Sequence, residues 1–313
     1  MKISGFSMVR NATKLYYPIK EAIESILPIC DEFIVAVGAG DTDDKTKERI
    51  QSIDSDKIKI IDTVWKEEHF ESGQVNAIQT NIALDECSGD WCFYLQADEV
   101  VHEKYLQVIE DRCREFLHDD EVEGLVFDYK HFWGDYDHYQ ISHGWYKREV
   151  RVIKNNLGIE SYKSAQGFRK YNDAGEEFKP QVAHANAEIF HYGWVRPPHY
   201  MQSKRKALDT VHIGKEEAKE RYNTAPDEFD YGPLDRLAVY NGTHPEVMQE
   251  WIAKMDWEDK LQYSGEPDPR REPHQHEELK NKILTTIERK LERKFGGKIY
   301  LSGHRNYELL GEK

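Results

Sequence analysis

Short apolar runs alternate with amphipathic segments along the first hundred residues, a pattern typical of strands alternating with helices. Residues 33–37 (FIVAV) and 91–95 (WCFYL) are uninterrupted apolar runs of the kind buried on both faces of a parallel sheet. Between residues 17 and 27, apolar side chains recur at helical spacing instead. This β-α-β-α-β-α-β order predicts an α/β fold with a mostly parallel sheet flanked by helices and right-handed crossovers.

Two polar segments follow predicted strands. Residues 38–46 (GAGDTDDKT) come after the second strand, and residues 96–99 (QADE) come after the fourth. In open α/β sheets, ligands bind beyond the carboxyl ends of the strands. The sequence therefore predicts a binding site where these two segments meet.

The pattern becomes mixed beyond residue 100, and the last hundred residues contain segments with helical character at 233–240, 245–261 and 277–295. We therefore predict an α/β domain at 1–210 and a helical C-terminal extension at 211–313. Apolar residues recur every four positions in the last segment and form a narrow stripe: Leu279, Ile283, Ile287, Leu291 and Phe295. We expect this stripe to dock on the main domain or on a second subunit, an arrangement compatible with a homodimer.

Charge and cysteine content narrow the classes of function. The chain of 313 residues has 43 basic and 58 acidic residues and a net charge of −15, which excludes general nucleic-acid binding. Its apolar runs are strand-sized and too short for a transmembrane segment or a signal peptide. The four scattered cysteines fit reduced thiols in the cytoplasm, with Cys30 and Cys92 in the core.

The adjacent carboxylates Asp98 and Glu99 are the most informative chemical feature. They follow an apolar strand, where a buried sheet edge meets solvent. Mg²⁺ and Mn²⁺ prefer oxygen ligands and take few from the protein when they bridge a diphosphate. The alternative is that one of these carboxylates caps the helix that begins near Glu103.

Several segments together resemble a known family. Val9-Arg10-Asn11, residues 31–46 and residues 89–99 occur in the order found in the bacterial-type family 2 glycosyltransferases, which have the GT-A fold. Residues 188–194 (EIFHYGW) look like a downstream strand of that family, whose His often supplies a metal ligand. The resemblance covers about residues 1–205.

The resemblance implies transfer of a sugar from a nucleotide-diphosphate donor to an acceptor hydroxyl, with inversion and with the help of Mn²⁺ or Mg²⁺. It implies Asp98 and His191 as metal ligands, with Arg10 and Lys or Arg side chains near His191 supplementing the cation. The residues expected to bind the nucleotide sugar are Val9, Arg10, Asn11, Gly38, Asp43, Gln79, Gln96, Ala97 and Asp98. The acceptor would be a surface polysaccharide in biosynthesis, a lipid-linked glycan at the inner membrane face, or a protein.

This sequence departs from the family pattern at three positions, one of which is Lys45, which looks like an insertion before Thr46. Gly38 stands where the family usually has an Asp that pairs with the uracil or ribose edge, and Gln96 replaces the first Asp of the metal element. These departures motivate one alternative, a catalytically decayed binding or scaffold protein. The other alternative is a sugar nucleotidyltransferase, which would normally show a Gly-rich phosphate loop after the first strand.

The catalytic base and the acceptor site are less well defined by sequence. Glu99, Asp135 and Glu149 are candidates for the base that takes the acceptor proton. Within the aromatic segment 131–146, we expect Trp133, Tyr136 and Trp145 to contact the acceptor, because flat rings stack on sugar faces; core packing is the alternative. His191 has a similar alternative as a structural core residue, and His274 and His276 are expected at the surface.

Overall fold

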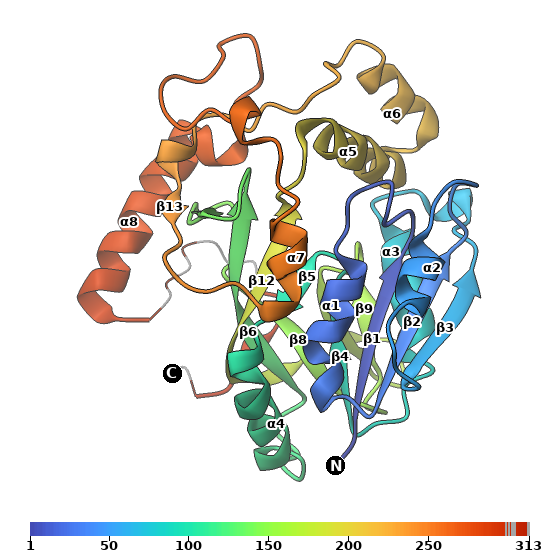
Figure 1. Cartoon of the computed structure of the whole chain (residues 1–313). Coiled ribbons are helices and arrows are strands. Elements are labelled where there is room, and N and C mark those ends of the chain that lie inside the picture. Colours follow the sequence, from blue (N-terminus) through green and yellow to red (C-terminus); the bar gives the residue numbers. More distant parts are fainter. Residues whose placement is uncertain (298, 300, 302–304, 312–313) are drawn as a thin grey trace.

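The computed structural model describes residues 1–297, 299, 301 and 305–311. Within them, eleven strands form one central sheet and three form a smaller one (Figure 1). The central strands are β1 (Ile3–Val9), β2 (Glu32–Gly38), β3 (Ile58–Thr63), β4 (Trp91–Tyr94), β5 (Glu99–Val101), β6 (Gly124–Trp133), β7 (His138–Gln140), β8 (Arg148–Lys154), β12 (Gln181–Trp194), β13 (Ala238–Val239) and β14 (Glu308–Leu309). The smaller sheet contains β9 (Ile159–Tyr162), β10 (Gly167–Tyr171) and β11 (Glu177–Phe178). The predicted α/β class is confirmed.

The parallel part of the central sheet is formed by strands from the N-terminal part of the chain. Along the order β13-β7-β6-β8-β4-β1-β2-β3, strands β4, β1, β2 and β3 run parallel to their neighbours in that group. β8 joins β4 to β6 in antiparallel fashion, and β12 pairs with the other edge of β6 in parallel and with β5 in antiparallel. The carboxyl ends of β1, β2 and β4 therefore open on the same side as the end of β12.

The described residues form eight α-helices, some of which cover the two faces of the parallel strands. They are α1 (Ile19–Ile26), α2 (Thr46–Gln51), α3 (Gln74–Leu84), α4 (Leu106–Glu115), α5 (Pro198–Ile213), α6 (Lys215–Tyr222), α7 (Gln249–Ile252) and α8 (Leu279–Phe295). Phe33 and Val35 pack in the cluster under α1 and α4, whereas Ile34 and Ala36 pack in the cluster under α3. This burial on both faces explains why β2 is an unbroken apolar run.

A third, aromatic cluster joins the C-terminal part to the sheet. Phe132 of β6 and Tyr192 of β12 pack there with Phe229, Leu234 and Trp257 from the C-terminal part. The cluster is one continuous core, and the boundary expected at residue 210 falls inside α5. Figure 1 shows α5 lying above the upper ends of the parallel strands.

The C-terminal helices differ from the sequence prediction. Residues 233–240 form a 3₁₀ turn and the short strand β13, which pairs with β7, so the predicted helix there is wrong. Pairing with an open sheet edge overrides the local helical pattern in this segment. Within 245–261, only α7 is α-helical, whereas the helix predicted at the end of the chain is present as α8.

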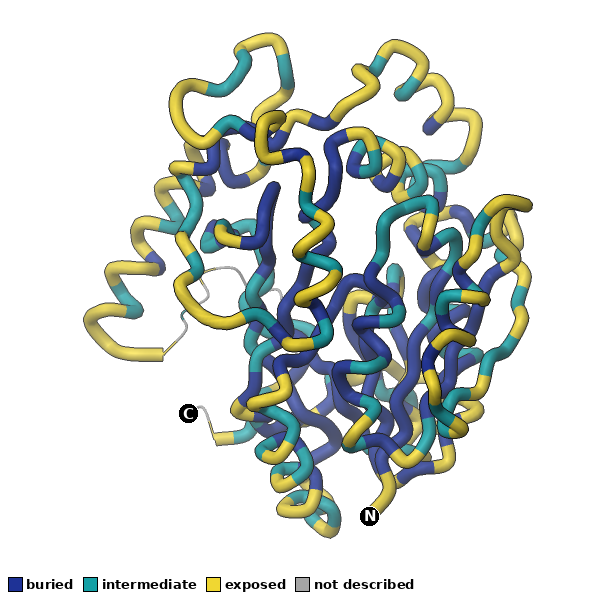
Figure 2. Tube along the Cα trace, in the orientation of Figure 1, coloured by how far each residue is buried: buried dark blue, intermediate teal, exposed yellow. Residues whose placement is uncertain are grey.

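The apolar stripe of α8 does not dock on the main domain among the described residues. Leu279 is 74% exposed and Phe295 is 67% exposed, and Figure 2 shows the outer side of α8 largely exposed. The helix instead buries Asn281 and Glu288, and the Glu288 carboxylate lies 2.8 Å from Nδ1 of His143. Polar contacts therefore hold this helix to the domain.

Candidate functional site

A cavity of about 520 Å³ opens at the carboxyl edge of the parallel strands. Residues 8–11 at the end of β1, residues 96–98 after β4, His191 and Trp194 of β12, and one face of α5 contribute to its lining. The charged side chains among the lining residues are Arg10, Lys204, Arg205, Lys215 and a single carboxylate, Asp98. A protein of net charge −15 thus presents a cationic cavity, which is suited to an anionic ligand.

Asp98 lines this cavity and is only 5% exposed. Its Oδ2 accepts a hydrogen bond of 2.9 Å from Nζ of Lys204 and lies 3.8 Å from Nε2 of His191 and 4.0 Å from Nη2 of Arg196. Burial alone would raise the pKa of Asp98, but the neighbouring Lys204, His191 and Arg196 hold it well below its usual range. Asp98 is therefore a carboxylate at neutral pH.

Lys204 reaches Asp98 from α5. Its Nζ also donates a hydrogen bond of 2.6 Å to the carbonyl oxygen of Gly193, and the side chain is 7% exposed. Burial and the neighbouring Arg196 lower the pKa of Lys204 to about 8, so the side chain is mainly an ammonium at pH 7. Arg196 is fully buried and donates to the carbonyl oxygens of Leu15 and Gly193.

His191 is held by a second histidine. Its Nδ1 lies 2.8 Å from Nδ1 of His131, whose Nε2 lies 2.7 Å from the carbonyl oxygen of Tyr146. Because that carbonyl can only accept, His131 carries its proton on Nε2 and accepts at Nδ1 from His191. Burial lowers the pKa of His191 to about 4, so the neutral ring keeps an unprotonated Nε2 on the side of Asp98.

Glu99 lies next to Asp98 in sequence but does not line the cavity. Both its carboxylate oxygens accept hydrogen bonds from Arg151, at 2.7 and 2.8 Å, and both residues are fully buried. Glu99 also accepts from the hydroxyl of Tyr129 and from the backbone N–H of Gln96. It therefore fixes the turn that presents Asp98.

The other two candidates for a base also lie away from both cavities described here. Asp135 accepts bonds from the backbone N–H groups of Asp137 and His138 and from the His138 ring, which closes a turn between β6 and β7. Glu149 accepts from Val150 N–H and from the Asn306 side chain, and burial raises its pKa. Their hydrogen bonds give all three carboxylates structural roles.

The 38–46 turn contributes less to the cavity than the sequence suggested. Gly38 lies against Trp65, because a Cβ atom there would come within 2.3 Å of the indole Nε1. Trp65 lines the cavity and occupies the space beside Gly38. Asp43 is outside the lining and pairs with Lys14, and Gln79 is buried against Thr63.

The predicted residues that the structure brings together at the cavity are Val9, Arg10, Asn11, Gln96, Ala97, Asp98 and His191. Gln96 is held there by a hydrogen bond of 3.0 Å from its Nε2 to the carbonyl oxygen of Ala165. The sequence predicted basic side chains near His191 only in general, without identifying Lys204, Arg196 or Arg205 individually. The available signal was a basic run, Lys204-Arg205-Lys206, in an acidic chain shortly after His191.

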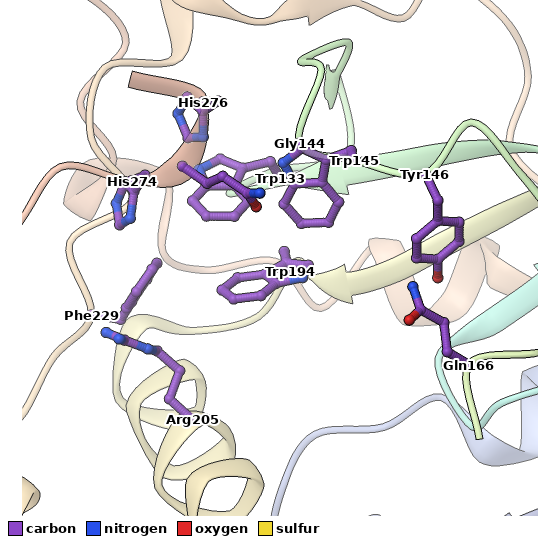
Figure 3. Close-up of a pocket in the computed structure, with 11 residues that line it drawn as sticks. Trp133, Gly144, Trp145, Tyr146, Gln166, Trp194, Arg205, Phe229, His274 and His276 are labelled. Atoms are coloured by element: carbon purple, nitrogen blue, oxygen red, sulfur yellow. The ribbon is translucent and has the colours of Figure 1, made fainter. Parts of the chain in front are cut away.

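A second cavity of about 320 Å³ adjoins the first and is rich in aromatic side chains (Figure 3). The rings of Trp133 and Trp194 stack with centroids 4.8 Å apart, and Trp145 meets Trp133 edge-on at 5.8 Å. Both cavities share four lining residues: Tyr146, Gln166, Trp194 and Arg205. They therefore form two chambers that meet at these side chains.

Other rings complete the aromatic cavity or lie behind it. Phe229, His274 and His276 line one end, and the Arg205 guanidinium lies 5.1 Å from the Phe229 ring (Figure 3). The expected surface position of His276 is wrong, because the residue is 8% exposed and its Nδ1 accepts a hydrogen bond from Gln140. Tyr136 is buried against Tyr192 and Trp257 instead of lining the cavity.

Gly193 allows Asp98 and His191 to approach each other. A Cβ atom at this position would come within 2.4 Å of Nε2 of His191 and 2.7 Å of Oδ2 of Asp98, far inside normal contact distance. We expect Gly193→Ala to displace both groups and the carbonyl that holds Lys204, and to lower the free energy of unfolding by about 1–3 kcal/mol. Urea unfolding followed by tryptophan fluorescence measures this change.

Asp173→Ala is the control for this prediction, because Asp173 is exposed and lines neither cavity. Its free energy of unfolding should lie within about 0.5 kcal/mol of that of the unmodified protein. An unchanged stability in Gly193→Ala would contradict the assigned packing of the site.

Comparison with known proteins gives structural matches only. No protein-family model matches the chain, and neither does a curated protein. One similar solved structure is S. aureus TarS, with 14% identity and a TM-score of 0.37, covering 66% of this chain and 39% of that one. Another is TarS 1–349, with 12% identity and a TM-score of 0.35, covering 72% of this chain and 73% of that one. A third is glucosyl-3-phosphoglycerate synthase from Mycobacterium tuberculosis, crystallised with Mn²⁺, UDP and phosphoglyceric acid, with 17% identity and a TM-score of 0.28, covering 42% of this chain and 43% of that one.

The chain thus spans about two fifths of the TarS chain, and TM-scores at this level assign no ligand to it. Among the described residues, no helix is both long and apolar enough to cross a bilayer. The functional assignment therefore depends on the geometry of the two cavities.

Proposed function

We propose that this protein transfers a sugar from a nucleoside-diphosphate donor to an acceptor hydroxyl. The observation that carries the proposal is the charge of the large cavity, in which four basic side chains and one buried carboxylate face a ligand space in a strongly acidic protein. A diphosphate carries about two to three negative charges and is best bound by fixed cations. The resemblance of the sequence to family 2 glycosyltransferases agrees with this reading.

The donor would occupy the large cavity. Arg10 and Asn11 at the end of β1 and the Trp65 ring suit a nucleoside, since the indole offers a flat stacking surface. Lys204 and Arg205 on α5 line the same cavity, and their charges suit the diphosphate. This placement follows the general rule for ligands at the carboxyl edge of parallel strands.

The acceptor would occupy the aromatic cavity. Trp145 and Trp194 provide ring surfaces on which sugars stack, with the buried Trp133 packed behind Trp194, so a glycan acceptor suits this space. The side chains shared by the two cavities mark the boundary at which the sugar of the donor and the acceptor hydroxyl can meet.

Direct displacement with inversion is the chemistry that this lining supports. A retaining mechanism through a covalent intermediate needs a free nucleophile, and the one carboxylate among the described lining residues is bound by Lys204. In the displacement, the acceptor oxygen bonds to the anomeric carbon as the bond to the diphosphate oxygen breaks. The electron pair leaves with the nucleoside diphosphate, and the acceptor proton passes to solvent.

A donor panel tests the proposal. We expect one nucleotide class among UDP-, GDP- and dTDP-sugars to raise the melting temperature and to release its nucleoside diphosphate slowly by hydrolysis, because water can replace the acceptor at an open site. Thermal shift and chromatographic detection of the released nucleotide measure these effects. Absence of both effects across the panel would favour the alternative of a decayed binding protein. Pyrophosphate-dependent conversion of a nucleotide sugar to a nucleoside triphosphate and a sugar phosphate would favour a nucleotidyltransferase.

A further inference from the structure

The buried ammonium of Lys204 occupies the position beside Asp98 where a divalent cation was expected from the sequence. Its Nζ lies 2.9 Å from Oδ2 of Asp98 and 2.6 Å from the Gly193 carbonyl oxygen. Both side chains are more than nine-tenths buried and line the large cavity. The negative charge of Asp98 is therefore already neutralised by a group of the chain itself.

The residues present do not fit a bound Mn²⁺ or Mg²⁺. These cations prefer oxygen ligands, and Asp98 supplies the one carboxylate among the described residues that line the cavity. Asp98 and the unprotonated Nε2 of His191 are the two donors at hand, and Asp98 is engaged by Lys204. A dication beside Asp98 would also be repelled by the ammonium and by Arg196, whose Nη2 lies 4.0 Å from the same oxygen.

Lys204 has donor capacity left for a ligand. An ammonium has three N–H donors, and the structure uses two of them, one to Asp98 and one to the Gly193 carbonyl. The rings of Tyr17 and Trp194 lie 5.2 and 5.9 Å from Nζ and favour the charged form. Because Lys204 lines the cavity, its remaining donor is available to an anion bound there.

We propose that Lys204 takes the place of the divalent cation: its ammonium binds the diphosphate of the donor and offsets the charge that develops on it as the sugar leaves. Arg205, the neighbouring guanidinium on the cavity wall, lies 5.1 Å from the Phe229 ring and adds a second cation. Nucleotide binding and transfer then proceed without added metal. This inference rests on the proposed function and specifies how the same site holds the donor.

Titration calorimetry with UDP, GDP and dTDP tests the inference on the whole chain, in excess EDTA and in Mn²⁺. We expect the nucleotide that binds to do so with affinities within about twofold under the two conditions. Lys204→Met, which keeps the length of the side chain and removes the charge, should weaken binding in EDTA by roughly 10- to 100-fold. Lys206→Met is the matched control on the same helix, since Lys206 is exposed and outside the cavity lining, and its affinity should be unchanged.

Mn²⁺ provides a further readout in the Lys204→Met protein, because loss of the ammonium frees Asp98 and His191. We expect Mn²⁺ to restore part of the lost affinity in this variant while leaving the unmodified protein unaffected. Binding by the unmodified protein in Mn²⁺ but not in EDTA would overturn the inference and leave the proposed function standing. Absence of nucleotide binding under both conditions would overturn both.

Discussion

Asp98→Asn should weaken nucleoside-diphosphate binding at pH 7 by about 100-fold. The carboxylate is the anionic partner of Lys204, and burial together with Arg196 already lowers the pKa of Lys204 to about 8. Without Asp98 this pKa falls further, so Lys204 loses its proton at pH 7 and the diphosphate loses its nearest cation. A buried amine neutralises in this way more readily than it remains an unpaired charge.

The pH dependence of the variant distinguishes this explanation from simple misfolding. Lowering the pH restores the proton on Lys204, so the affinity of Asp98→Asn relative to the unmodified protein should rise from pH 8 to pH 6. Titration calorimetry at pH 6, 7 and 8 with the nucleotide that binds measures the ratio. A ratio that falls toward pH 6 would contradict the assigned role of the pair.

Asp62→Asn is the matched control. Asp62 also pairs with a lysine, Lys47, at 2.7 Å, but its side chain is 71% exposed and lies outside the cavity. An exposed ion pair of this kind contributes about 0 to 1 kcal/mol to stability, so this variant should bind and unfold like the unmodified protein.

The parallel half of the fold could be predicted because its strands are buried on both faces. Unbroken apolar runs such as residues 33–37 and 91–95 have few alternatives to a central strand, and β2 and β4 follow them closely. The short strands β7 and β13 have no such pattern. They form because their edges meet in the fold, and the pairing of Ala238 with Tyr139 joins residues about a hundred positions apart.

The cavity residues that follow strands of the sheet could be predicted from the sequence, whereas those on helix α5 could not. Residues that follow strands, such as Asn11 and Asp98, are placed by the general geometry of parallel sheets. Lys204 meets Asp98 across 106 residues, and its position depends on how α5 lies over the sheet. A lysine in a basic run reads as solvated surface by sequence, since a buried lysine needs a partner that only the fold supplies.

The catalytic base is difficult to predict from the sequence for a related reason. Glu99 is adjacent to Asp98 in sequence, but Asp98 lies in the turn before β5, whereas Glu99 is the first residue of β5 and pairs with the buried Arg151. Sequence distance therefore suggested a shared role for two carboxylates that the fold separates. The pairing of Glu99 with Arg151 can be tested through stability.

Arg151→Met should lower the free energy of unfolding by about 3–5 kcal/mol. Arg151 is fully buried, donates to both oxygens of Glu99, and donates to the carbonyl oxygens of Val150 and Gln166 at 2.9 and 3.0 Å. Its loss leaves Glu99 as a buried carboxylate whose remaining bonds come from Tyr129 and Gln96 N–H. Urea unfolding followed by tryptophan fluorescence measures the change, and a loss below about 1 kcal/mol would contradict the buried pair.

Two further variants make this result specific. Arg114→Met removes one partner of an exposed pair with Glu110 and should change stability by less than about 1 kcal/mol. The double variant Glu99→Gln/Arg151→Met should be more stable than Arg151→Met alone, because a neutral amide replaces the unpaired carboxylate. We expect the single variant Glu99→Gln to lose stability, because the buried Arg151 then has no anionic partner. Its sugar-transfer activity should fall only as far as the turn that presents Asp98 shifts. If Glu99 were instead the catalytic base, Glu99→Gln would abolish transfer without loss of stability.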